Sequence, residues 1–239
     1  IADDLISTHI KQRNISGIEG YNIGAVAHVG DSLVRMELFP EVPIIGYKGW
    51  SINDDNFIEY NMLTHHIDAD VEMKSEESLI SIYTEHNDSA SNHQEDVIVK
   101  IKDVKLSEWL AFNPYAPPIK GDMSADMNIN WGGGRLNGKG KISLDDFVYG
   151  KESVGTFVAD IGVSTDKSGQ TSANATLMVD EVKTVTIAGT LNDSTAQSPF
   201  MLDFSMIHFP LKVLNPMLPK KMASLKGTLN GKMTIGGNA

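Results

Sequence analysis

The 239-residue sequence contains no cysteine, so it can form no disulfide, no thiolate zinc site and no thiol nucleophile. It is also poor in positive charge: 20 lysines and arginines stand against 31 aspartates and glutamates, for a formal net charge of −11. Nucleic-acid binding needs a basic surface that meets the phosphates, so this balance argues against a nucleic-acid partner. No apolar run approaches the length of a membrane-spanning helix.

Recognisable catalytic motifs are missing as well. The sequence has no GxSxG, no HExxH, no phosphate-binding loop and no dinucleotide-binding fingerprint. His66, Asp68 and Asp70 would share one face of a strand, and a solvated strand face explains them more simply than a metal site. The sequence therefore predicts that the protein is not an enzyme and has neither a cofactor nor a metal.

The sequence is rich in strict two-residue alternation. Residues 225–235 place apolar residues and glycine on one face and polar residues on the other, and residues 122–131 repeat the pattern. Alternation of this kind is typical of a β-strand with one dry and one wet face. Only 7% of residues are aromatic, whereas turn-forming residues are plentiful, which suits many strands joined by tight turns.

The whole pattern predicts an all-β fold. We expect about a dozen strands in a long antiparallel meander with one continuous apolar face, and one or two short helical turns. Residues 22–38 read as a hairpin and residues 39–55 as a loop with an anchored aromatic residue. A phase slip predicts a bulge at Asp103, and Ser107 is expected to cap the helical turn that follows. Residues 1–20 are ambiguous between a helix and an edge strand.

A unit of strand, helical turn and strand occurs twice. Asn113-Pro114 and Lys120-Gly121 in the first copy correspond to Asn215-Pro216 and Lys226-Gly227 in the second, at a spacing of about 102 to 106 residues. Repetition suggests an elongated array of stacked units. We therefore divide the chain into a lead-in segment (1–20), a first repeat region (21–121) and a second (122–239) that continues it.

This unit, together with GWSINDDNFIEYN (49–61), IDADVEM (67–73) and SLISIYTEH (78–86), resembles the C-terminal region of TamB proteins of the Bacteroidetes type. TamB is a relative of AsmA and of the bridge-like lipid transfer proteins. The resemblance covers most of residues 20–239. It implies a β-taco, which is a long sheet folded lengthwise into an open hydrophobic trough.

The resemblance also implies a location and a function. It implies a periplasmic segment of an inner-membrane-anchored envelope protein that reaches towards the outer membrane. Its expected function is phospholipid transport between the two membranes, outer-membrane protein assembly, or both. The expected partners are phospholipid acyl chains and an outer-membrane assembly barrel protein. Since the chain does not begin with Met, we expect it to be an internal piece of a longer protein.

Two interpretations of the apolar face remain open. It could be the core of a β-sandwich, in which case the chain would be a binding module for a glycan or a protein partner at the cell envelope. It could instead be an open trough for acyl chains, where flexible methionines suit a promiscuous apolar surface. Exposed sheet edges would also permit edge-to-edge self-association. The candidate lipid-contact residues are Met123, Met127, Ile129, Ile142, Leu144, Phe157, Ile161, Leu177, Val185, Ile187, Leu202, Phe204, Leu225, Leu229, Met233 and Ile235.

Overall fold

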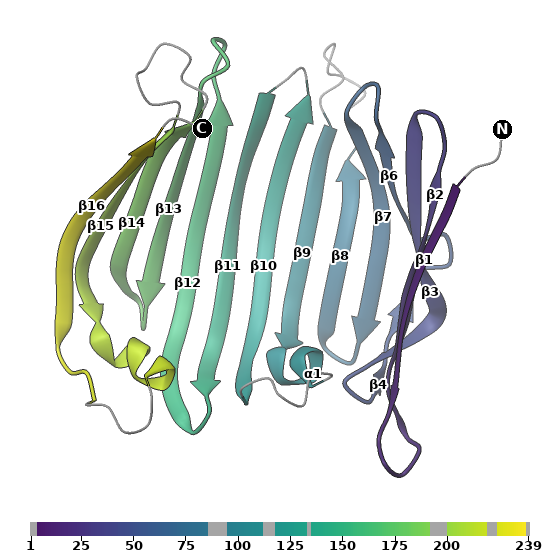
Figure 1. Ribbon diagram of the computed structural model, residues 1–239, viewed down its shortest axis with the longest axis horizontal. Coiled ribbons are helices and arrows are strands. Elements are labelled where there is room, and N and C mark those ends of the chain that lie inside the picture. Colours follow the sequence, from purple (N-terminus) through teal and green to yellow (C-terminus); the bar gives the residue numbers. More distant parts are fainter. Residues whose placement is uncertain are drawn as a thin grey trace.

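The computed structural model describes residues 4–85, 95–111, 118–132, 135–191, 200–218 and 224–237. Within these residues all strands belong to one 16-stranded sheet, in which each strand of the main path pairs antiparallel with the next (Figure 1). Short β4 and β5 lie off this path and pair with β3 and β7. The all-β meander is therefore confirmed, and a two-sheet sandwich is not what these strands form.

The strand bounds follow the predicted alternation for most of the chain. The N-terminal strands are β1 (Asp4–Arg13), β2 (Glu19–Val29), β3 (Leu33–Ile45), β4 (Lys48–Gly49), β5 (Ser51–Ile52), β6 (Phe57–Asn61), β7 (His66–Ser75), β8 (Ser78–Glu85) and β9 (Glu95–Lys105). The C-terminal strands are β10 (Ile119–Gly132), β11 (Arg135–Tyr149), β12 (Glu152–Thr165), β13 (Thr171–Val179), β14 (Val182–Leu191), β15 (Phe200–Pro210) and β16 (Thr228–Gly237). The division predicted at residues 121/122 falls within β10.

The structure settles one N-terminal segment that the sequence left ambiguous and corrects another. The lead-in segment contains β1, an edge strand paired along its length with β2. Residues 39–55 are not one loop, because β3 runs on to Ile45 and β4 and β5 follow. Pro40 and Pro43 lie between Phe39 and Ile44, which pair with Gly24 and Asn22 respectively. The prolines thus occupy a bulge, where the ladder needs no N–H from them.

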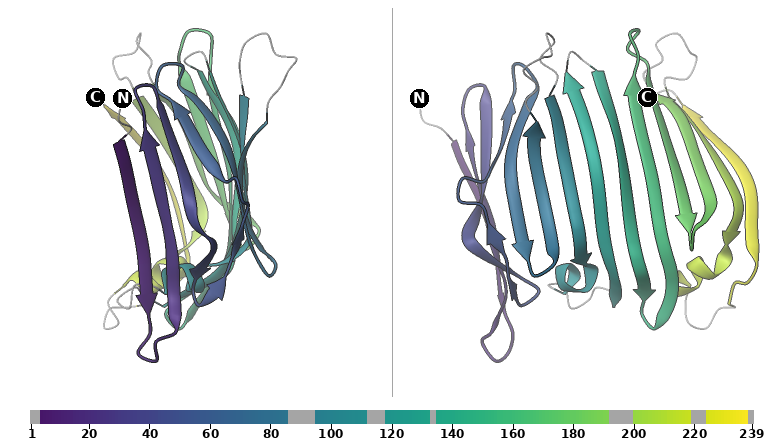
Figure 2. Two further views of the ribbon diagram at one scale, coloured as in Figure 1. Left: turned by 90° about the vertical axis from the view of Figure 1, so that its right-hand side faces the viewer. Right: turned by 180° about the vertical axis from the view of Figure 1, so that it is seen from behind.

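The sheet is strongly curved. In the side view its first and last strands turn towards the same side, and the middle strands form the back (Figure 2). The two short helices, α1 (Leu106–Leu110) and η1 (Leu211–Met217), lie at the same end of the sheet, the lower end in Figure 1. Trp109 of α1 packs against the cluster of apolar side chains on β7 to β9, so α1 covers the apolar side of the sheet.

The two copies of the repeated unit share a local geometry, although Asn113 and Pro114 lie outside the described residues. Asp103 and His208 precede the two helices and have left-handed φ angles of 49° and 52°. The register of the sheet shifts beside each of them. The backbone N–H of Asp103 donates to Ser124 Oγ at 3.1 Å, and that of His208 donates to Asn230 Oδ1 at 2.7 Å.

The same repeat confirms one local prediction and corrects another. The bulge at Asp103 was expected and is present. Ser107, however, is not the helix cap: α1 begins at Leu106, and its cap residue Lys105 makes no side-chain capping hydrogen bond. The phase slip identified the bulge, but α1 begins one residue before the serine that was expected to cap it.

Candidate functional site: the apolar face

One face of the sheet is apolar from β7 to β16. Directly paired residues of antiparallel strands point to the same side, so the face can be followed from partner to partner. One row that crosses the sheet in this way consists of Val71, Ile82, Val99, Met127, Gly140, Ile161, Ala175, Ile187, Phe204 and Met233. We call this side of the sheet the apolar face.

The structure brings together nearly all of the predicted lipid-contact residues. Every one of them except Leu225 lies in a strand and on the apolar face, between β10 and β16. Leu225 precedes β16 and lies in no strand. Its backbone is instead held by Asn215, whose side-chain amide donates to Leu225 O at 3.0 Å and accepts from Leu225 N at 2.6 Å.

The C-terminal part of this face is only partly covered. Ile161 is 41% exposed, Met233 49% and Ile235 41%, although all three point to the apolar side. Among the described apolar residues of β11 to β16, Val154 and Val179 are fully buried. We call the apolar face of β10 to β16 the open section.

A small apolar hollow lies in the middle of the open section. It has a volume of about 140 Å³ and is lined mainly by Met127, Ile129, Ile161 and Val163 around two glycines of β11. The glycines create the space: a Cβ on Gly140 would come within 2.6 Å of Met127 Cγ. The hollow has almost no polar lining, so it suits a hydrocarbon group and offers no hydrogen bonds.

The N-terminal part of the face is a closed core. Val71, Met73 and Val104 are at most 3% exposed and cluster with Tyr21, Ile45 and Ile52. Trp50, between β4 and β5, is 1% exposed in the same cluster, and its ring meets that of Trp109 edge to face at 5.8 Å. We call this cluster the closed section. The sequence predicted an anchored aromatic residue at 39–55, but it gave no sign that Trp109 would join it.

The helix η1 closes the lower end of the open section. Lys212 Nζ bonds Asp180 Oδ2 at 2.9 Å, and Asp180 Oδ1 also accepts from the backbone N–H of Thr156. The Lys212 ammonium, followed by that backbone N–H, lowers the pKa of Asp180 below its usual value of 3.8. These bonds tie η1 to the β13–β14 turn, which is itself bonded to β12.

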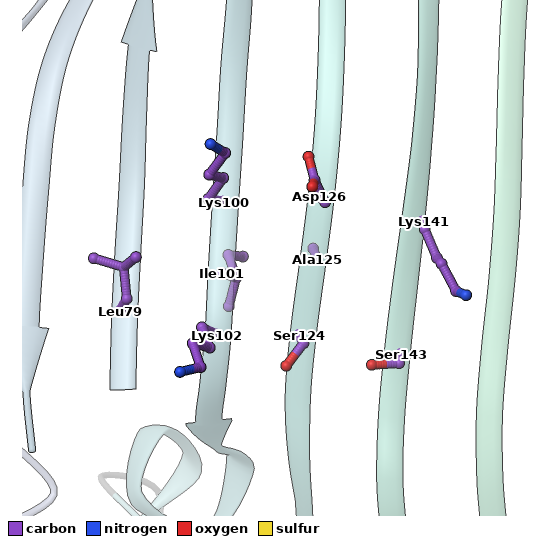
Figure 3. Close-up of a pocket in the computed structure, with 9 residues that line it drawn as sticks. All are labelled: Leu79, Lys100, Ile101, Lys102, Ser124, Ala125, Asp126, Lys141 and Ser143. Carbon is purple, nitrogen blue, oxygen red and sulfur yellow. The ribbon is translucent and has the colours of Figure 1, made fainter. Parts of the chain in front are cut away.

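The opposite face of the sheet is polar and carries charges of alternating sign. Lys100 pairs with Asp126, Asp126 with Lys141, and Lys141 with Asp160 on successive strands. A shallow depression of about 300 Å³ lies over this ladder. Figure 3 shows that the amino groups of Lys100, Lys102 and Lys141 point away from one another. The arrangement fits cross-strand pairing, which fixes register, better than a binding site for an anion.

No metal-binding cluster of three or more His, Asp or Glu side chains occurs among the residues that the structure describes. Asp68, Asp70 and Glu72 line a wide hollow of about 700 Å³ on the polar face.

Among the residues that the structure describes, no helix combines the length and the apolar character that a membrane span requires. Comparisons of the chain with protein-family models, with curated proteins and with solved structures found no match.

Proposed function

We propose that the open section is the wall of a hydrophobic trough that holds phospholipid acyl chains. In this proposal the chain is a non-enzymatic, periplasmic segment of a TamB-like envelope protein that carries lipid between membranes or assists outer-membrane protein assembly. The observation that supports it most is the apolar row from Met127 to Met233, which includes exposed side chains such as Ile161.

The energetics suit a ligand without polar recognition. Each methylene group that leaves water on such a surface contributes about 0.8 kcal/mol. About eight methylenes would therefore gain about 6 kcal/mol without a hydrogen bond. The apolar hollow at Gly138 and Gly140 and the flexible Met127 and Met233 would let chains of different length and saturation fit.

Site-specific photo-crosslinking tests the proposal. A photoreactive residue at Met233 or Met127 lies on the apolar face, whereas its neighbour in sequence, Lys232 or Asn128, lies on the polar face of the same strand. With phospholipid vesicles we expect lipid adducts at Met233 and Met127 and none at the two neighbours. Equal labelling of both faces, or no adduct at either methionine, would contradict the proposal.

A charged variant provides a second test. Ile161→Asp places a carboxylate in the row beside the hollow, at a site that is 41% exposed, so the sheet should still form. We expect the adduct at Met127 to be lost, because a carboxylate repels hydrocarbon from the adjoining surface. The matched control is Asp160→Asn on the polar face, which should leave the adduct unchanged.

A further inference from the structure

The helix α1 stands at the border between the closed and open sections. It follows β9 directly and packs against β10, while its Trp109 covers the closed section. We propose that α1 is a lid over the closed section, and that its displacement uncovers Trp50 and the apolar residues beneath and so extends the open section. This inference rests on the proposed function, because it concerns how far along the same face a lipid can reach.

The lid is held mainly through one residue, Glu108. The Tyr21 hydroxyl donates to the backbone carbonyl of Glu108. Lys48 Nζ lies 2.9 Å from Glu108 Oε1 and 2.9 Å from Glu76 Oε2. A Cβ on Gly46 would meet Glu108 Cβ at 2.6 Å, so the β3–β4 turn touches the helix closely. These contacts come from β2, from the β3–β4 turn and from β4. They hold α1 against the closed section.

The lid is otherwise weakly fixed. It has five residues, none of them fully buried, and no side chain caps its N-terminus. A helix of this length is not stable without tertiary contacts. The indole N–H groups of Trp50 and Trp109 are both buried without an acceptor. An unmet buried donor is costly, so the closed state carries a penalty that opening would relieve at Trp109.

The second copy of the unit is fastened differently. The helix η1 has Lys212 bonded to Asp180, and Asn215, also in η1, makes two hydrogen bonds to the backbone of Leu225. The sequence of η1, LKVLNPM, contains no tryptophan, so this helix has no counterpart of Trp109 and its buried N–H. The comparison therefore assigns the movable role to α1 and a fixed role to η1.

Tryptophan fluorescence tests the lid on the protein alone. The chain has three tryptophans, so Trp131→Phe leaves only Trp50 and Trp109, the pair at the lid. In that background we expect Lys48→Met with Tyr21→Phe to raise acrylamide quenching about threefold, because the ties that favour closing are lost. Lys74→Met, which removes an ion pair on the polar face, is the control and should change nothing. Unchanged quenching in the loosened variant would overturn the proposal.

A crosslinked lid separates this inference from the proposed function. Because the chain has no cysteine, Lys48→Cys with Glu108→Cys can be joined by a short thiol-reactive crosslinker without competing thiols. We expect a photoreactive residue at Met73 to capture phosphatidylcholine from vesicles in the uncrosslinked protein and not in the crosslinked one. A photoreactive residue at Met233 should capture it in both.

The outcomes are distinct. Capture at Met233 but never at Met73, even with Lys48→Met and Tyr21→Phe, overturns the lid and leaves the proposed function intact. Equal capture at Met73 with and without the crosslink also overturns the lid. Failure of capture at Met233 overturns the proposed function itself. If the photoreactive residue at position 73 disturbs folding, the fluorescence experiment still decides whether α1 moves.

Discussion

The closed and open sections share one sheet, one face and one alternating pattern, yet they differ in what covers them. In the closed section Val71 and Met73 are each 3% exposed. They cluster with Trp50, between β4 and β5, and with Trp109 of α1. In the open section Ile161 and Met233 lie on the same face, in the row that contains Val71, and are 41% and 49% exposed. Alternation therefore decides which side of a strand is apolar, and residues outside the strands decide whether that side becomes a core.

Trp50 is the side chain on which this difference depends most. It is 1% exposed and large, so Trp50→Ala should lower the free energy of unfolding by about 3–5 kcal/mol through lost burial and the cavity left behind. Trp131→Ala, at a 48% exposed residue of the open section, should cost less than about 1 kcal/mol. Urea titrations of the two variants measure the contrast, and similar losses would mean that the sections do not differ.

Glycines give a smaller contrast, between β2 and the outermost strand β16. A Cβ on Gly24 of β2 would come within 2.7 Å of Thr8 O and 2.4 Å of the Phe39 ring, whereas one on Gly231 of β16 would have its nearest neighbour at 4.0 Å. Gly24→Ala should destabilise by about 1–3 kcal/mol through overpacking. Gly231→Ala should be neutral or stabilising by up to about 1 kcal/mol. Thermal unfolding of the two variants tests whether the apolar face of β16 has the room that the exposure of Met233 indicates.

Asn215 tests how the lower end of the open section is held. Asn215→Ala removes both side-chain hydrogen bonds to Leu225 and should cost about 1 kcal/mol. Amide hydrogen exchange should accelerate near Leu225 and at the start of β16 and stay unchanged in β7. As a control, Asn174→Ala at an exposed position of β13 should change the free energy of unfolding by no more than about 0.5 kcal/mol. Faster exchange in β7 would contradict the view that the contacts of η1 and those of α1 stabilise the sheet independently.

The smallest effect is a pH dependence at η1. The pKa of Asp180 is lowered in the folded protein, chiefly by Lys212, so its charged form favours folding. That contribution is complete above the usual pKa of 3.8 and is lost as pH falls through the lower folded value. Because the pair is half exposed, Lys212→Met should cost less than about 1 kcal/mol at neutral pH. The difference from the parent protein should shrink as the pH falls below 3.8, and a constant difference would contradict this assignment.

Much of the sheet could be predicted because alternation is a local property of the backbone. The face that carries Met127, Ile161 and Met233 follows from period two alone, and the phase slip at Asp103 was enough to locate a bulge. Segments without clean alternation were harder. Pro40 and Pro43 indicated a loop, yet they lie in a bulge within β3, and that depends on the pairing of β3 with β2.

The closed section could not be predicted for a different reason. Trp50 and Trp109 lie outside the long alternating strands, and they meet only because the sheet curves and brings α1 next to β4 and β5. No local pattern encodes a contact between residues so far apart in the chain. Likewise, nothing in the sequence around Leu225 shows that Asn215 would hold it ahead of β16 instead of within the strand.

Cysteine labelling is the most direct test of the central claim that the apolar face is closed over β7 to β9 and open over β10 to β16. Single cysteines at Val71, Met73, Ile161 and Met233 can be compared in a chain that has no other thiol. We predict fast reaction with a water-soluble maleimide at Ile161 and Met233 and slow reaction, limited by opening of the structure, at Val71 and Met73. Protection at all four positions would show that the open section is covered, and would contradict the account.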